Sequence, residues 1–102
     1  MITEVNFMNI TDELLRFEGK ALVYFSSAAF PLCRVQDGEF REYSEKSGDV
    51  KCINIISDKS PDLSMLYGIM SAPTLVLFEN GKEIRRTSEV LKANEIEEFV
   101  KK

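Results

Sequence analysis

Three short apolar runs dominate the pattern of hydrophobic and polar positions along the chain. Residues 21–25 and 74–78 are almost continuously apolar, and residues 50–56 are largely so. Short runs of this kind, bounded by polar and turn-forming residues, are typical of strands that are buried on both faces of a sheet. The pattern therefore predicts three central strands.

Two further segments predict strands at the edges of the same sheet. Residues 2–7 carry their apolar side chains in an imperfect alternation, which is typical of a short edge strand. Residues 83–87 follow the segment 79–82, which contains the dipeptide Asn80-Gly81. An Asn-Gly pair between two strand-like runs predicts a tight hairpin, so residues 83–87 are expected to pair with residues 74–78.

The segments between these strands have apolar residues at helical spacing among polar ones. Thr11 or Asn9 can cap the first helix, and Gly19 would follow its end. Pro31 suits the first turn of the second helix, and Gly68 would stop the third. The pattern thus predicts four helices, over residues 12–17, 31–46, 61–67 and 94–102.

The predicted order of elements is β-α-β-α-β-α-β-β-α. Strands separated by helices pair in parallel through right-handed crossovers, whereas the hairpin adds an antiparallel pair. The expected fold class is α/β, with a mixed central sheet covered by helices on both faces. The length of 102 residues is that of one domain, so residues 1–102 are expected to form a single domain.

The composition excludes several classes of function. The net charge of −4 disfavours nucleic acid or an anionic membrane as the main partner, and no apolar run approaches the ~20 residues of a membrane span. With no histidine and two cysteines, the chain is not expected to hold a metal or another cofactor. Its N-terminus lacks the pattern of a secretory signal, so we expect a cytoplasmic protein with reduced thiols.

Four short motifs, in order and at fitting separations, resemble those of the thioredoxin family. They are Val23-Tyr24-Phe25, Phe30-Pro31-Leu32-Cys33, Ala72-Pro73-Thr74 and Phe78-Glu79-Asn80-Gly81-Lys82. The resemblance covers nearly the whole chain and implies a thioredoxin fold. It also implies a cis peptide bond before Pro73, and the thiol–disulfide exchange that is the activity of this family.

The departures from the family pattern gather at its active site. Phe30 takes the place of the first, attacking cysteine, whereas Cys33 keeps the place of the second. Tyr24 stands where the family has a buried, proton-transferring aspartate, and Ala29 stands where it has a tryptophan. Near Glu89 the family usually has a glycine that lines its substrate groove. All these changes affect the same site.

Two functions remain open from these residues. Disulfide exchange needs an attacking thiolate and a second thiol that resolves the mixed disulfide, and phenylalanine cannot replace the first. The favoured hypothesis is a redox-impaired module that binds a protein or an extended peptide by strand addition, which needs no thiol. Five residues would form its groove: Phe30, Pro31, Ala72, Pro73 and Thr74.

The alternative is a thiol–disulfide oxidoreductase that acts through Cys33 alone, with glutathione or a thiol of a partner. The helix N-terminus would favour a thiolate at Cys33, whereas burial beneath residue 30 would favour an inert thiol. The burial hypothesis is preferred. Cys52 lies within a predicted strand and is expected to be a core thiol, pointing either toward Tyr24 or away from it. A structural or accessory role is the third possibility.

Overall fold

The three apolar runs form the centre of a five-stranded mixed sheet. The computed structural model describes residues 1–101. Its strands are β1 (Ile2–Glu4), β2 (Lys20–Ser26), β3 (Lys51–Ile56), β4 (Thr74–Glu79) and β5 (Lys82–Thr87), in the spatial order β1-β3-β2-β4-β5. The first three strands of this order are parallel to one another, and β4 is antiparallel to both β2 and β5. The predicted fold class is confirmed.

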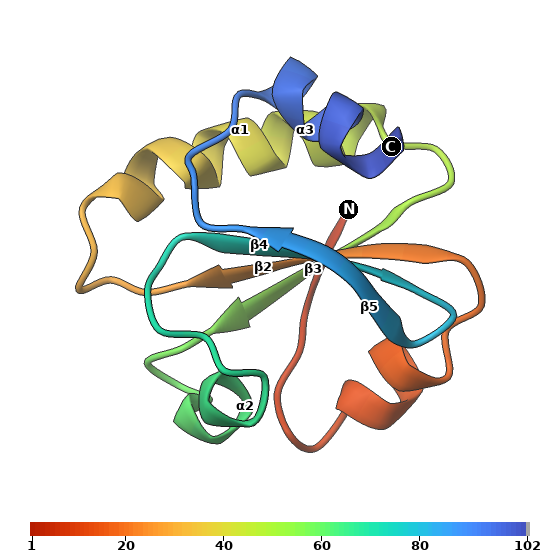
Figure 1. Cartoon of the computed structure of the whole chain (residues 1–102), viewed down its shortest axis with the longest axis vertical. Coiled ribbons are helices and arrows are strands. Elements are labelled where there is room, and N and C mark those ends of the chain that lie inside the picture. Colours follow the sequence, from red (N-terminus) through yellow and green to blue (C-terminus); the bar gives the residue numbers. More distant parts are fainter. Residues whose placement is uncertain (102) are drawn as a thin grey trace.

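The helices cover both faces of the sheet (Figure 1). The helices are α1 (Leu32–Lys46), α2 (Pro61–Leu66) and α3 (Ala93–Lys101), preceded by a π-helical turn, η1 (Thr11–Leu15). Helices α1 and α3 pack on one face, where Tyr24, Phe40 and Ile96 belong to a single buried cluster. The turn η1 and helix α2 pack on the other, where Leu14 and Leu63 meet side chains of the central strands. Alternate residues of β2 therefore enter two separate cores.

The hairpin between β4 and β5 has the two-residue turn that its sequence predicts. Asn80 and Gly81 both have positive φ, at 52° and 80°, as a type I′ turn requires. A Cβ atom at Gly81 would also collide with the backbone oxygen of Leu15. Position 81 therefore needs glycine for two reasons, the backbone conformation and the close approach of η1.

The N-terminal segment differs from the prediction. The strand expected over residues 2–7 ends at Glu4, and the α-helix expected over residues 12–17 is a π-helical turn that ends at Leu15. Asn6 accounts for the early end of the strand, because its Oδ1 accepts the backbone N–H groups of Met8 (2.8 Å) and Asn9 (3.3 Å) and turns the chain. Capping by Asn9 or Thr11 was the wrong expectation, since the residue before η1 is Ile10, which has no side-chain cap.

The remaining boundaries within residues 1–101 agree with the pattern to within one or two residues, and the expected end of the last helix, at residue 102, lies outside the described residues. Helix α1 begins one residue after Pro31, which adopts helical dihedral angles with φ at −58°. No helix among residues 1–101 is long and apolar enough to cross a bilayer. The sheet and α1 together position the loop of residues 27–31, which joins β2 to α1 and carries the candidate site.

Candidate functional site

Phe30 is presented at the surface, one helical turn before a buried thiol. It is 42% exposed, although it is a large apolar residue, whereas Cys33 is 4% exposed. The backbone N–H of Cys33 donates to the carbonyl oxygen of Phe30 at 3.0 Å, so the two residues lie one helical turn apart. The position that would face a partner thus carries an aromatic ring, and the thiol lies below it.

Tyr24 ties β2 to α1 beneath this loop. Its hydroxyl group donates to Oδ1 of Asp37 at 2.6 Å and lies 3.1 Å from the carbonyl oxygen of Cys33. A hydroxyl group has one hydrogen, and the shorter contact to a carboxylate is the stronger bond, so Asp37 is its main partner. Burial, together with the adjacent Asp37 carboxylate, raises the pKa of Tyr24 far above its ordinary value. Tyr24 therefore stays neutral at physiological pH and cannot accept a proton from a thiol.

Asp58, in the loop between β3 and α2, fixes the segment that leads to Phe30. Its Oδ1 accepts the hydroxyl of Ser27 at 2.6 Å, and its Oδ2 accepts the backbone N–H of Ala28 at 2.9 Å. The Ser27 hydroxyl oxygen in turn accepts the N–H of Ala29 at 3.2 Å. These hydrogen bonds lower the pKa of Asp58, so the carboxylate keeps its charge over the neutral range.

The expected groove residues do not all reach the surface. The Ala72–Pro73 peptide bond is cis. Ala72, Pro73 and Thr74 are nevertheless buried in the free protein. Phe30 and Ala72 border one hollow of about 330 Å³, on the side of the loop that faces α2. The exposed Pro31 does not line this hollow, and neither do Pro73 and Thr74.

Residues near α2 supply the accessible part of this hollow. Ile69, Met70 and Ser71 line it together with Phe30, and the Met70 side chain is fully exposed. An unbranched, polarisable methionine side chain adapts to differently shaped partners. The hollow thus combines apolar side chains and an adaptable rim with polar groups such as Ser57, Ser64 and Asp58, rather than the row of backbone groups that the sequence led us to expect.

Cys52 lies on the same face of the sheet as Tyr24, which decides between the two orientations left open. It is buried in the cluster that includes Tyr24 and pairs laterally with Leu22 of β2. Its Sγ lies 3.6 Å from the hydroxyl oxygen of Ser47, and burial raises the pKa of this thiol. Both cysteines are free thiols. Cys52 therefore belongs to the core beside the end of α1.

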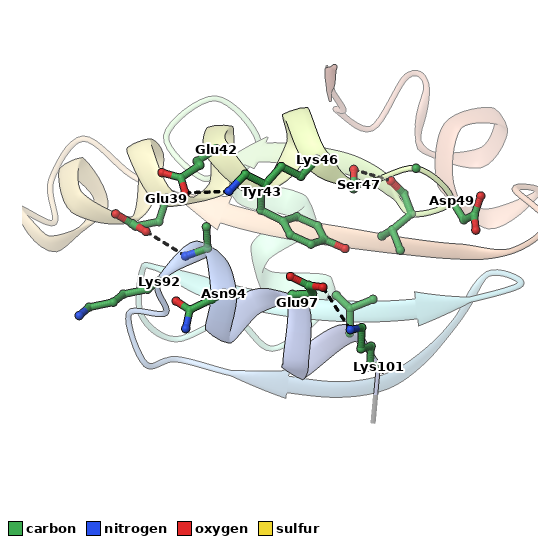
Figure 2. A pocket seen from close by; sticks show the side chains of 14 residues that line it. Glu39, Glu42, Tyr43, Lys46, Ser47, Asp49, Lys92, Asn94, Glu97 and Lys101 are labelled. Atoms are coloured by element: carbon green, nitrogen blue, oxygen red, sulfur yellow. Dashed lines mark hydrogen bonds and ion pairs between the residues drawn. The ribbon is translucent and has the colours of Figure 1, made fainter.

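A larger hollow of about 550 Å³ lies between α1 and α3, away from the loop of residues 27–31 (Figure 2). Part of its charged rim is paired, since Glu42 bonds Lys46 and Glu97 bonds Lys101, each within its own helix. Glu39 accepts the backbone N–H of Ala93 and so joins the two helices. This groove contains neither cysteine nor Phe30, and its polar groups serve the packing of the two helices.

Several residues of the site were not identified from the sequence. Asp37 follows Cys33 by four positions, a helical spacing that could have placed both side chains on one face of α1. Asp58 carries no such signal, because its contact with Ser27 joins two loops that are distant in the sequence. Arg34 and Arg41 line a hollow on the other side of the loop. In the sequence alone, they cannot be told from ordinary solvent-exposed helix residues.

Comparisons with known proteins agree with the geometry. The thioredoxin family model matches residues 1–102. The chain is 29% identical over 86 residues to thioredoxin of Mycoplasma genitalium, a match that covers 84% of each chain. It is 33% identical over 87 residues to chloroplastic thioredoxin Y of Oryza sativa subsp. japonica, covering 83% of this chain and 52% of the other. It is also 29% identical over 87 residues to glutaredoxin-3 of Bos taurus, covering 83% and 26%.

Proposed function

The chain belongs to the thioredoxin family, and from that membership we propose that it is a redox-impaired module that binds a protein or an extended peptide segment. One observation carries the proposal. An exposed aromatic ring, Phe30, stands where the family resemblance puts the attacking thiol, and the remaining thiol, Cys33, is buried one helical turn later. The site therefore offers contact surface where exchange chemistry would need a nucleophile.

The chemistry of thiol–disulfide exchange supports a binding role over an exchange role. In thiol–disulfide exchange, a thiolate attacks one sulfur of a disulfide, a mixed disulfide forms, and a second thiol displaces it. Phe30 can perform no step of this cycle. Cys33 is 4% exposed and Cys52 is buried near the other end of β3, so the two thiols cannot replace the missing pair.

The same ring is a suitable anchor for binding. Phenylalanine has on the order of 200 Å² of surface, so the exposed 42% of Phe30 is about 80 Å². Covering that area with a partner would contribute about 2 kcal/mol at 25 cal/mol per Å², which corresponds to about 30-fold in affinity. Phe30 and the neighbouring Met70 line one hollow, so both can contact a single bound side chain.

A single-thiol oxidoreductase is the second candidate, and one observation favours it. Cys33 lines an open hollow of about 440 Å³ on the side of the loop opposite α2. A small thiol such as glutathione could approach the sulfur from that side. Tyr24 is neutral and could not serve as the base for Cys33, so this activity would need another group of the hollow, such as the Asp37 carboxylate, to take the proton.

A reductase assay separates the two candidates. We expect the protein to reduce a protein disulfide, with dithiothreitol as donor, no faster than dithiothreitol alone. Cys33→Ser should leave this rate unchanged. A clear rate enhancement that disappears in Cys33→Ser, with either dithiothreitol or glutathione as donor, would establish the oxidoreductase instead.

A peptide-binding assay tests the favoured function directly. A phage-displayed library of linear peptides is selected on the immobilised protein, and enriched peptides are measured by fluorescence anisotropy. Phe30→Ala should weaken binding by about 30-fold, from the area estimated above. The matched control is Phe7→Ala, since Phe7 is also exposed but lines neither hollow that borders Phe30. Enrichment of no peptide, or equal binding by the wild type and Phe30→Ala, would refute the proposal.

A further inference from the structure

Two hollows of different chemistry meet at Phe30. The hollow toward α2 is lined by the apolar residues Ile69, Met70 and Ala72, together with several serines and the Asp58 carboxylate. The hollow on the other side is lined by Arg34 and Arg41 of α1 and by side chains of β2 and β3. Phe30 borders both hollows. A segment bound over Phe30 would therefore meet apolar side chains of the hollow toward α2 on one side and the two arginines on the other.

The two arginines lie on one face of α1 and have no partner of their own. Arg34 and Arg41 are seven residues apart, which places them on the same side of the helix and about 10 Å apart along its axis. Both are exposed. Neither guanidinium group makes a hydrogen bond or an ion pair with any other residue in 1–101. Every other arginine side chain, in contrast, contacts a carboxylate or a backbone carbonyl.

Two acidic side chains around this loop, Asp37 and Asp58, are already hydrogen-bonded. Asp37 lies between them on α1, but its Oδ1 accepts the hydroxyl of Tyr24 rather than a guanidinium group. Asp58 is bound to the loop of residues 27–31. The whole chain has a net charge of −4, so two unpaired arginines in one hollow are a local exception.

The floor of the basic hollow also has a spare hydrogen-bond donor. Ser26 is 9% exposed, and its Oγ accepts an N–H of Asn54 at 3.0 Å. The hydroxyl hydrogen of Ser26 has no acceptor within the described part of the chain. Together with the two guanidinium groups, it could bind an oxygen-rich anionic group such as a carboxylate.

We propose that the partner is an acidic segment of another protein, with an apolar side chain in the hollow toward α2 and carboxylates beside Arg34 and Arg41. This inference rests on the proposed function and adds the chemical class of its ligand. Charge complementarity selects the acidic segment over a neutral or basic one. The net charge of the protein opposes an acidic partner at long range, so the preference comes from local contacts and weakens as salt is added.

The test compares short synthetic peptides in fluorescence anisotropy. The acidic probe has a Leu-Phe pair flanked on both sides by aspartates, the neutral probe has asparagines in their place, and the basic probe has lysines. The wild type should bind the acidic probe about 3- to 10-fold more tightly than the neutral one at low ionic strength, as expected for two exposed charge pairs. This preference should disappear at about 0.5 M salt.

Charge variants determine whether the arginines are responsible. The double variant Arg34→Gln/Arg41→Gln should lose the preference but keep its affinity for the neutral probe, and Arg34→Glu/Arg41→Glu should favour the basic probe. The control Arg16→Gln/Lys82→Gln changes the net charge equally at residues outside this hollow and should keep the preference. If the wild type binds the acidic and neutral probes equally, and both lose affinity in Phe30→Ala, this inference is wrong and the proposed function stands. If it binds none of the probes, both are overturned.

Discussion

Replacing Tyr24 by phenylalanine removes a single oxygen atom that joins β2 to α1 below the candidate site. The hydroxyl is buried and donates to Asp37 at 2.6 Å. A hydrogen bond to a charged group contributes about 1.5–3 kcal/mol, and the exposed Asp37 carboxylate can recover part of this from water. We therefore expect Tyr24→Phe to lower the free energy of unfolding by about 1.5 kcal/mol at pH 7. For a domain of this size, each kcal/mol of lost stability lowers Tm by about 4–8 °C.

The loss of stability caused by Tyr24→Phe should become smaller as pH rises above 10. The folded-state pKa of Tyr24 is raised above its unfolded value of about 10, so folding favours the protonated form. The contribution of this group is therefore fully present below pH 10 and is lost as pH rises above 10, at about 1.4 kcal/mol per pH unit. The wild type should lose about 2 kcal/mol by pH 11.5 through Tyr24 alone. Tyr24→Phe cannot lose this contribution, so the two stability curves should meet near pH 11.

Urea denaturation, followed by circular dichroism between pH 7 and 11.5, measures the loss of stability at pH 7 and its change with pH. The difference in absorbance at 295 nm between the wild type and the variant reports the ionisation of Tyr24. The control is Tyr43→Phe, because burial raises the pKa of Tyr43 to about 12, but no hydrogen bond is found for its hydroxyl within residues 1–101. Tyr43→Phe should cost less at pH 7. A difference signal at pH 10 with native circular dichroism, or a stability difference for Tyr24→Phe that is constant with pH, would refute the argument.

Three further outcomes follow from the same structure. Phe30→Cys places two thiols one helical turn apart, so oxidation should produce a disulfide with Cys33 and restore part of the reductase activity; two free thiols after oxidation, counted with a disulfide reagent, would contradict this. In the native wild type, Cys52 should react with such a reagent only on unfolding, because it is buried, and rapid labelling would contradict its place in the core. Gly81→Ala should destabilise the protein by about 1–3 kcal/mol in a denaturant titration, whereas Gly48→Ala, which has open space around it, should change stability by less than about 0.5 kcal/mol.

The central fold could be predicted because local and tertiary preferences agree there. The apolar run 21–25 is buried on both faces in the structure, as its lack of alternation indicates. The Asn80-Gly81 turn is similar, since it requires a backbone conformation that these two residue types adopt most readily. In both cases the sequence pattern reports a constraint that acts within a few residues.

The N-terminal segment and the site depend on contacts that no local pattern reports. The side chain of Asn6 accepts two backbone N–H groups just after β1. These local hydrogen bonds replace the pairing with a neighbouring strand that would continue β1. Asp58 acts on Ser27 across 31 positions of sequence, and the basic hollow is lined by side chains from β1, β2, α1 and β3. These features arise only when the elements have packed.

Under the proposed binding function, the residues at positions 24 and 30 are consistent with each other, as expected of a rebuilt site rather than a damaged one. A buried carboxylate at position 24 would carry a desolvation cost and would serve a thiol exchange that Phe30 prevents. Tyr24 instead fills the core edge-on to Phe40, with the ring centroids 5.1 Å apart, and its hydroxyl has a charged partner in Asp37. A simple loss of the nucleophile would leave an unpaired buried acid or an unfilled space beneath the loop. The described residues instead leave no buried side-chain nitrogen or oxygen without a partner, so the core beneath the loop is complete without an acid at position 24.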